Sequence, residues 1–463
     1  MTANNKLKLL LVNPPAPQII EPHYDRPDFP RTALAFLAGH VRDRCNSDIE
    51  IQVMDCKFDK LNEKESAARI LKINPDIIGF TAMTNEIKSA ARLCSILKEE
   101  CQFTSIVGGV HYTALPEETL REFSCFDFGV AGEGEEVLCD LLMAIKNNLE
   151  PDIPGVGSVV NNKFIGSKDA QKILDQNTIN PAWDMFRPAK EYLIQSSRGC
   201  PFACEFCMNP GGRVVRPRSI ETTIKELKWL VENMKPESIY FGDEIFTVNQ
   251  KRAELICDEM IKEKLHHSFS WRCQTHVSTL NENLVRKMKL SNCKLVGLGI
   301  ETGNDLMFKN MGKGTSRKKV KNAIEILNRY KLDYSTFFIL GQANETFSSA
   351  KDTVNFAIEL NPMEPVFGLM VPYPGTIVWE MAKNNRNGFK LLSTDWDAYN
   401  KQIGDALALD GITRPQLERL QFFGYVKVFL YNYRFLDFIK FCFKYRTTGM
   451  SLVLKQFMYL VRR

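Results

Sequence analysis

The sequence lacks any long apolar segment. Residues Met1 to Lys8 are polar, and the first apolar run, Leu9–Val12, is too short for the core of a secretion signal. Near the other end, Gln421–Arg446 is rich in Phe and Tyr, but Lys and Arg interrupt it. No charge-free run there approaches the ~18–20 residues that a spanning helix needs. We therefore expect neither a signal peptide nor a transmembrane helix.

A disulfide framework is also absent. The chain has 463 residues and thirteen cysteines, a density far below that of small secreted scaffolds. All but three of the cysteines are scattered singly, which is typical of small buried apolar side chains. We expect a reducing, cytoplasmic location.

The chain has little net charge, and that charge is unevenly placed. The formal charge is +5, whereas residues 421–463 hold eight Lys or Arg and one acid, Asp437. The remainder is close to neutral, so no nucleic-acid partner is indicated. The aromatic, basic end has two interpretations. It is either a terminal helical subdomain or an amphipathic surface in peripheral contact with anionic lipid or a lipid-like substrate.

The first ~150 residues alternate strand and helix patterns, which predicts a doubly wound, Rossmann-like parallel α/β domain. The expected strands are Leu7–Asn13, Ile49–Asp55, Ile77–Thr81, Ser105–Val107 and Phe126–Ala131. The expected helices are Thr32–Arg44, Lys64–Ile73, Asn85–Glu100, Leu115–Phe123 and Glu135–Lys146. Residues 151–188 break this rhythm, and we interpret them as a linker that contains a small hairpin at Asn161-Asn162.

A second alternating series begins near residue 189 and extends to about 385. Its six strand–helix units predict a partial (β/α)6 barrel, and 386–463 form a C-terminal helical region. The expected strands are Tyr192–Ser196, Ser238–Gly242, Phe269–Cys273, Lys294–Ile300, Tyr334–Leu340 and Val366–Val371. The expected helices are Ile220–Met234, Gln250–Lys264, Glu282–Leu290, Arg317–Tyr330 and Thr346–Leu360, with Ser219 and Asn344 as helix starts.

Three cysteines stand together in the spacing C-x3-C-x2-C, at Cys200, Cys204 and Cys207, just after an expected strand. A zinc site normally needs four ligands, and no matching Cys or His pair lies nearby in the sequence. Four-iron clusters usually take four thiolates, so three leave one iron with an open position. An open metal position is typical of catalysis, and the carboxyl end of a strand is where α/β folds place it.

Other candidate residues follow later strands of the second series. Asp243 and Glu244, after Gly242, could accept hydrogen bonds from a ligand ammonium, or could be an acid pair at a helix start. Arg272 could hold a carboxylate or form a surface ion pair. Glu301, in a glycine-rich turn, could accept from ribose hydroxyls. Phe206 could shield a cluster or flank a purine, or simply pack.

In the first domain, small-residue turns follow three expected strands. Ligands of open α/β sheets bind at that edge, so these turns predict a cleft for a large cofactor. The alternative is tight turns without a ligand, with His111 as a surface or capping residue. The turn residues are Thr81, Thr84, Gly108, Gly109, His111, Gly132 and Glu133.

The cysteine triplet resembles that of the radical S-adenosylmethionine superfamily, and the domain before it resembles the cobalamin-binding domain of one branch. The resemblance implies that Cys200, Cys204 and Cys207 hold a 4Fe–4S cluster whose open iron chelates S-adenosylmethionine. It also implies that Gly242-Asp243-Glu244 contacts the methionine part, although the common Gly-Gly-Glu form is absent.

Further roles follow from the same resemblance. Glu301 matches the ribose-contacting position, Arg272 is a carboxylate contact, and Gly341–Thr346 is a diverged form of a later loop of the family. An Asp-x-His-x-x-Gly motif is absent, which leaves the lower coordination of cobalamin open.

The resemblance implies methylation of an unactivated carbon through methylcobalamin. The expected substrate is a small molecule, either lipid-like or a biosynthetic intermediate, and the expected electron donor is external, such as flavodoxin or ferredoxin. Radical cyclisation or rearrangement is the alternative within the branch. A non-catalytic cobalamin- or metal-binding sensor is the alternative outside enzymes.

Overall fold

The computed structural model describes residues 6–17, 27–167, 172–402 and 404–445. The rest of the expected C-terminal region, 446–463, lies outside them. The chain divides into two compact units. Unit 1 is Met1–Leu193 with Pro210–Arg218, and unit 2 is Ile194–Asn209 with Ser219–Arg463.

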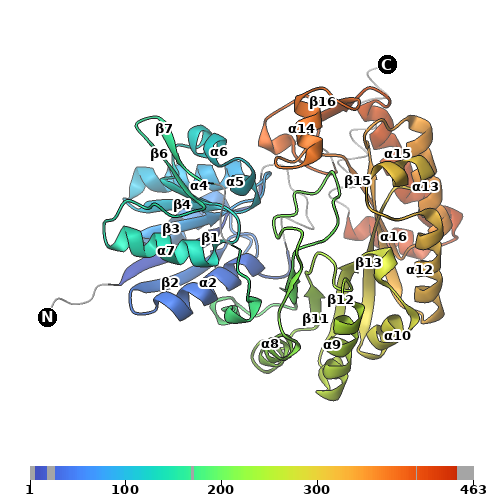
Figure 1. The fold of residues 1–463 in the computed structure, drawn as a ribbon, viewed down its shortest axis with the longest axis horizontal. Coiled ribbons are helices and arrows are strands. Elements are labelled where there is room, and N and C mark those ends of the chain that lie inside the picture. Colours follow the sequence, from blue (N-terminus) through green and yellow to red (C-terminus); the bar gives the residue numbers. More distant parts are fainter. Residues whose placement is uncertain (1–5, 18–26, 168–171, 403, 446–463) are drawn as a thin grey trace. The chain divides into compact units, whose positions relative to one another are not determined.

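Unit 1 is built on a seven-stranded sheet in the order β2-β1-β3-β4-β5-β6-β7 (Figure 1). Strands β1 to β5 pair in parallel, and β3 is buried along its whole length, which explains its unbroken apolar sequence. The strands are β1 Leu7–Asn13, β2 Ile49–Asp55, β3 Ile77–Thr81, β4 Thr104–Gly108, β5 Phe128–Val130, β6 Val156–Val160 and β7 Lys163–Gly166.

Helices cover both faces of this sheet, so the doubly wound fold expected from the sequence is confirmed. Helices α2 and α7 are neighbours (Figure 1), and so are α3 and α4. The helices are α2 Thr32–Cys45, α3 Glu63–Ile73, α4 Ile87–Glu100, α5 Val110–Ala114, α6 Pro116–Glu122 and α7 Gly134–Lys146. The short helix α5 was not predicted.

The expected hairpin forms, but it is not part of a free linker. Its strands β6 and β7 are antiparallel, and β6 pairs with β5, so the hairpin extends the sheet of unit 1. Asn161 and Asn162 both have positive φ, 50° and 62°, as a two-residue hairpin turn requires. The region 151–166 therefore continues the first sheet.

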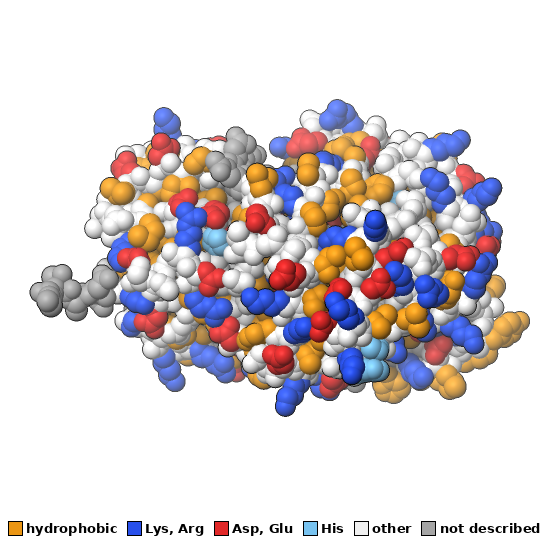
Figure 2. Space-filling model, turned by 60° about the horizontal axis from the view of Figure 1, so that its bottom comes forward, with side chains coloured by type: hydrophobic (Ala, Val, Ile, Leu, Met, Phe, Trp, Pro, Cys, Tyr) orange, Lys and Arg blue, Asp and Glu red, His pale blue; other side chains and the backbone are white. Residues whose placement is uncertain are grey.

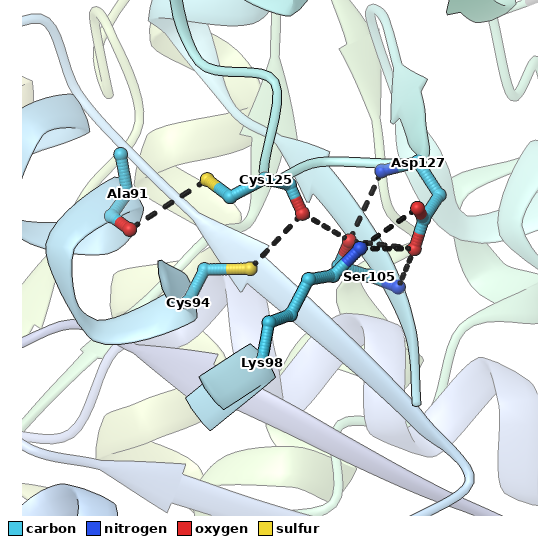
Figure 3. A network of polar contacts seen from close by, with 6 residues as sticks. All are labelled: Ala91, Cys94, Lys98, Ser105, Cys125 and Asp127. Atoms are coloured by element: carbon cyan, nitrogen blue, oxygen red, sulfur yellow. Dashed lines mark hydrogen bonds and ion pairs between the residues drawn. The ribbon is translucent and has the colours of Figure 1, made fainter. Parts of the chain in front are cut away.

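A polar network ties the amino-terminal ends of β4 and β5 to helix α4 (Figure 3). The buried Ser105 donates from Oγ to the Cys125 carbonyl (2.7 Å), and its backbone N–H bonds Asp127 (2.8 Å). Lys98 Nζ lies 2.8 Å from Asp127, and Cys94 donates to the Cys125 carbonyl. These bonds lie at the amino-terminal ends of the strands. Ligands of α/β sheets bind at the opposite, carboxyl ends.

Unit 2 contains a six-stranded sheet in the order β15-β14-β13-β12-β11-β8. Strands β11 to β15 pair in parallel, and the boundary between the units falls within β8. The strands are β8 Glu191–Ile194, β11 Ser238–Phe241, β12 Ser270–Thr275, β13 Cys293–Glu301, β14 Asp333–Leu340 and β15 Glu364–Leu369. The two-residue strand β9 Ser197–Arg198 follows β8, and β16 Phe389–Leu391 pairs with β17 Leu407–Leu409 in a small antiparallel sheet.

Helices α8, α9, α10 and α12 pack neighbour to neighbour along unit 2 (Figure 1), as in a partial barrel. The helices are α8 Ile220–Asn233, α9 Gln250–Lys262, α10 Glu282–Leu290, α11 Asp305–Asn310, α12 Arg317–Arg329, α13 Phe347–Leu360, α14 Ile377–Lys383, α15 Arg414–Tyr431 and α16 Phe435–Lys444. Ser219 caps α8 as predicted, but Thr346 rather than Asn344 caps α13, because Asn344 is left-handed, with φ 56°.

The C-terminal helices form the end of unit 2. Helix α15 packs against α13 and β15, and α16 packs against α15. In the described part of the chain, no helix is both long and apolar enough to cross a membrane.

Candidate functional site

The three cysteines lie on one loop of unit 2, which we call the cysteine loop (residues 199–209). It follows β9 and contains no helix or strand. Cys200 and Cys204 are partly exposed and Cys207 is exposed. Two hydrogen bonds brace the loop: the Asn209 side chain donates from Nδ2 to the Cys200 carbonyl (2.8 Å), and the Val378 N–H donates to the Glu205 carbonyl (3.2 Å).

The three thiols are near one another but do not converge. Among the described residues, no three His, Cys, Asp or Glu side chains form a group that could hold a metal ion. Burial raises the pKa of Cys204 to about 11, so its thiol is protonated at neutral pH. A cysteine must lose this proton before it can bind a metal, and a metal site is rarely preformed before the metal binds. The donor set itself, three soft thiolates with a vacancy, fits an iron–sulfur cluster.

The acid pair after β11 divides into two roles. The buried Asp243 accepts hydrogen bonds from Ser196 N (2.6 Å), Ser196 Oγ (2.7 Å) and Ser197 Oγ (2.7 Å), so both of its oxygens are occupied. Its neighbour Glu244 keeps a buried Oε2 that has no hydrogen-bond partner among the described residues. Burial raises the pKa of Glu244, and a cation would reverse that effect. Glu244 is therefore suited to accept a hydrogen bond from a ligand ammonium, whereas Asp243 holds Ser196 and Ser197, which follow β8, against the end of β11.

Glu301 ends β13 in a left-handed conformation, with φ 70°, beside an irregularity in the register with β14. Its side chain is buried, and Lys313 Nζ lies 2.5 Å from its Oε1 and 2.7 Å from the Gly299 carbonyl. A Cβ at Gly299 would lie 2.6 Å from both Glu301 Oε1 and Lys313 Nζ, so the glycine leaves room for these two side chains. Gln342, in the loop after β14, supports the same turn through the Glu301 carbonyl (2.9 Å).

Two residues of this site were missed by the sequence analysis, Lys313 and His276. His276 directly follows β12, and its ring stacks on Phe202 of the cysteine loop, with centroids 4.3 Å apart. Burial, together with the charge of Lys313, lowers the pKa of His276 to about 4, so the imidazole is neutral at physiological pH. A position directly after a parallel strand was the signal that could have found His276.

The structure gives Arg272 and Phe206 other neighbours. Strand β12 runs on to Thr275, so Arg272 lies inside the strand rather than at its end, and its guanidinium stacks 4.2 Å from the centre of the Tyr240 ring. Phe206 packs against an apolar group that includes Val378 and Phe389, which supports the packing interpretation.

The candidate residues of unit 1 do lie at the carboxyl ends of β3, β4 and β5. Thr81 and Thr84 are buried, and Gly132 is exposed with φ 72°. Gly109, after Gly108, has φ 101°, and a Cβ there would lie 2.5 Å from the Ala82 carbonyl oxygen. This close approach explains Gly109 without a ligand.

His111 and Glu133 are engaged within unit 1. His111 is buried, and burial lowers its pKa to about 4. Glu133 forms a two-pronged, mostly buried ion pair with Arg216, with Nη1 to Oε2 at 2.7 Å, and also accepts from the Ile173 N–H (3.0 Å). Arg216 was not predicted, because it stands 83 residues away from Glu133 in the sequence.

A second buried ion pair was also missed at this edge. Lys57 Nζ lies 2.6 Å from Glu86 Oε1, and both side chains are almost fully buried. Although burial acts in the opposite direction, Arg31 and Lys57 lower the pKa of Glu86 to about 2. Nearby, Asn13 Nδ2 donates to the buried Asp55 (2.7 Å). This edge of the sheet therefore contains buried charged side chains as well as turns made of small residues.

Comparisons with known proteins match both parts of the chain. A family model described as the radical SAM superfamily matches residues 194–357, and one described as a B12-binding domain matches residues 26–142. These matches identify the cofactors as a 4Fe–4S cluster, S-adenosylmethionine and cobalamin.

The similarity to individual proteins extends over nearly the whole chain. The chain is 31% identical over 437 residues to an uncharacterized methyltransferase of Pyrococcus horikoshii, PH0819, covering 92% of this chain and 93% of the relative. It is 26% identical over 429 residues to the anaerobic magnesium-protoporphyrin IX monomethyl ester cyclase of Rubrivivax gelatinosus, covering 89% and 75%.

Among solved structures, the chain resembles the cobalamin-dependent S-adenosylmethionine radical enzyme OxsB with aqua-cobalamin and S-adenosylmethionine bound. The TM-score is 0.73 at 16% identity, over 99% of this chain and 76% of that one, which is a likeness of fold. The chain therefore belongs to the radical SAM superfamily, in the branch of cobalamin-dependent enzymes, methyltransferases among them, that joins a B12-binding domain to the radical SAM core.

Proposed function

We propose that this enzyme methylates an unactivated carbon of a small molecule. The observation that carries the proposal is that unit 2 contains both the cysteine loop and a buried Glu244 Oε2 without a hydrogen-bond partner among the described residues. The chain is also similar to an uncharacterized methyltransferase along almost its whole length. When bound, the cluster and S-adenosylmethionine supply a 5′-deoxyadenosyl radical, and cobalamin carries the methyl group.

In unit 2, we propose that Cys200, Cys204 and Cys207 hold the cluster. Glu244 accepts a hydrogen bond from the ammonium of S-adenosylmethionine, beside the backbone of Gly242. Glu301 accepts from a ribose hydroxyl while Lys313 balances its charge. Asp243 is a positioning residue, because its oxygens hold Ser196 and Ser197. Arg272 and Phe206 have neighbours within unit 2, so we assign them no direct contact.

In unit 1, we propose that the edge formed by Thr81, Thr84, Gly108 and Gly132 faces cobalamin. Gly109 and Glu133 are explained by contacts within the protein. His111 is buried, and the described His40 faces Glu136 at 3.2 Å. Neither is placed as an accessible metal ligand, which supports cobalamin binding without a histidine from these positions.

We retain the four-part division expected from the sequence, with one adjustment. Residues 1–150 bind cobalamin, 189–385 hold the cluster and S-adenosylmethionine, and 386–463 form the helical end. The hairpin within 151–188 serves the cobalamin domain, since β6 pairs with β5.

Radical cyclisation remains the second candidate function, because the cyclase of Rubrivivax gelatinosus is similar over 429 residues. The two reactions differ in their first product. A methyltransferase must load cobalamin from S-adenosylmethionine, which releases S-adenosylhomocysteine, whereas a cyclase need release only 5′-deoxyadenosine.

The test needs no knowledge of the substrate. Anaerobically reconstituted protein is mixed with reduced cobalamin and S-adenosylmethionine, and S-adenosylhomocysteine is quantified while the cobalamin spectrum is followed. We expect stoichiometric S-adenosylhomocysteine together with the spectrum of methylcobalamin. Formation of 5′-deoxyadenosine without any S-adenosylhomocysteine would favour the cyclase.

The electron that starts the radical reaction must come from a donor. We propose that this donor is an external protein of the flavodoxin or ferredoxin type, as the likeness to the radical SAM family implies. Replacing the chemical reductant with either protein in the same assay tests this.

A further inference from the structure

The last described helix, α16, is apolar on two opposite faces. Its inner face packs on α15: Phe441 contacts Tyr425 and Phe429, with ring centroids 5.3 and 5.2 Å apart, and Phe438 also contacts Phe429. A helix with an apolar stripe on one side is satisfied by such packing.

The opposite side, which we call the outer face, consists of Phe435, Leu436, Ile439 and Phe443. These residues recur at helical spacing, and their exposed fractions are 54%, 75%, 52% and 70%. Not one residue of α16 is fully buried. Single exposed apolar residues need no explanation, whereas a contiguous apolar face indicates a binding surface.

The charges around this face indicate what binds it. Lys440 is exposed on α16, and Lys444 Nζ lies 2.6 Å from Glu364 at its end. Across residues 421–463, eight Lys or Arg stand against one acid, Asp437, which is paired with Arg434. The acids Asp437 and Glu364 are thus each paired with a cation, and Lys440 adds an exposed positive charge to this apolar helix.

Three occupants could cover the outer face: the segment 446–463, a second copy of the chain, or a lipid surface. Charge complementarity favours the last of them. Residues 446–463 add four further basic residues and no acid, so covering the face with this segment would place like charges together. A second copy of the chain would do the same. An anionic lipid surface instead supplies the opposite charge, which attracts each nearby Lys or Arg.

We propose that the outer face of α16 docks the enzyme on an anionic membrane surface. The four apolar side chains enter the boundary between headgroups and acyl chains, while Lys440 contacts lipid phosphates. This mode lies on the membrane without crossing it. It goes beyond the proposed reaction, since neither cofactor site contains residues of α16.

The experiment is flotation of the full-length holoenzyme with vesicles. We expect it to float with vesicles that contain phosphatidylglycerol and to remain at the bottom with phosphatidylcholine alone. Raising the salt concentration should release it, because screening weakens surface attraction. The proposal would be overturned if the protein stayed at the bottom of the gradient with both vesicle types, or if it floated equally with both.

A matched pair of variants locates the surface. The double substitution Leu436→Glu and Phe443→Glu should lower the partition coefficient by more than about tenfold. The control, Leu290→Glu with Leu306→Glu, changes two side chains elsewhere on unit 2 that are 56% and 61% exposed, and should float as the parent does.

Two further measurements keep the result interpretable. Cleavage of S-adenosylmethionine at the parental rate shows that each variant is folded. Size-exclusion chromatography with light scattering reports the oligomeric state: a parent dimer that Leu436→Glu with Phe443→Glu converts to a monomer would show that a second copy covers the face, and would overturn membrane docking.

Discussion

Lys313 Nζ lies 2.5 Å from Glu301 Oε1, and each side chain is only 9% exposed. The sequence suggested Glu301 as a free acceptor for a ribose, and it gave no reason to select Lys313. The structure makes them one neutral unit beside the cysteine loop, where the charge of Lys313 also acts on Cys204. A ligand that approaches Glu301 therefore meets a carboxylate already held by a cation.

Lys313→Met should destabilise unit 2 by about 3 kcal/mol, because it leaves the buried carboxylate of Glu301 without its partner. Urea unfolding monitored by tryptophan fluorescence measures the loss. The double variant Lys313→Met with Glu301→Gln should recover most of it, since no charge is then left buried. Additive losses in the double variant would contradict the pairing.

Cys204→Ala should abolish formation of 5′-deoxyadenosine under strong reductant and remove the iron and sulfide from the purified protein. A cluster held by two remaining thiolates has lost a ligand that the loop cannot replace. The matched control is Cys442→Ala, an exposed cysteine on α16. It should retain iron, sulfide and activity, and equal iron in both variants would remove Cys204 from the ligand set.

Glu345 should make stability depend on pH. Its side chain is fully buried and accepts a hydrogen bond from Gln342 N (3.1 Å) and another from Gly341 N, while its Oε1 has no partner among the described residues. Burial raises its pKa from 4.5 to about 7. A raised carboxyl pKa means that its stabilising contribution is complete below about pH 4.5 and is lost as the pH rises through about 7.

Glu345→Gln keeps the shape but removes this titration. Thermal unfolding at pH 8 should show the variant to be more stable than the parent, by up to about 3 kcal/mol, with little difference at pH 5. Glu325→Gln, at an exposed position of α12, is the control and should follow the parent at both pH values. Parallel pH profiles for the parent and Glu345→Gln would be evidence against the raised pKa.

Gly109→Ala should destabilise unit 1 and weaken cobalamin binding. Two costs combine: a left-handed φ of 101°, about 1–2 kcal/mol for an L-residue, and a Cβ 2.5 Å from the Ala82 carbonyl oxygen, about 1–3 kcal/mol of overpacking. Gly314 is the matched control, because it also has positive φ, 65°, but a Cβ there meets nothing within 4 Å. Gly314→Ala should therefore lower the urea midpoint less, and equal shifts would mean that the close contact has no cost.

Much of the fold could be predicted because apolar periodicity sets it. Strands β1, β2 and β3 have the predicted bounds. β1 and β3 are mostly buried and contain apolar runs, whereas β2 alternates apolar with polar residues, and both patterns are typical of strands. The hairpin of β6 and β7 was recognised by its Asn-Asn turn, but its pairing with β5 was not. Pairing between strands depends on which edge is free, and local sequence does not encode that.

The candidate site divides in the same way. The cysteine spacing and the residues after β11 and β13 are local signals, and the structure places them in unit 2. The partners of these residues are not local. Ser196 stands 47 residues before Asp243, and Gln342 stands 41 residues after Glu301. Such contacts decide which oxygen of the Asp243-Glu244 pair is free, and only the fold reveals them.

The buried bond between Glu133 and Arg216 has a consequence for inheritance. Arg216 belongs to unit 1, yet the chain reaches it only after leaving that unit and forming the cysteine loop. A gene fragment that ends at Leu193 would therefore encode a buried acid without its cation. Recombination that exchanges the cobalamin module between relatives must transfer two separate pieces together, so the two halves of this enzyme are expected to diverge as one heritable unit.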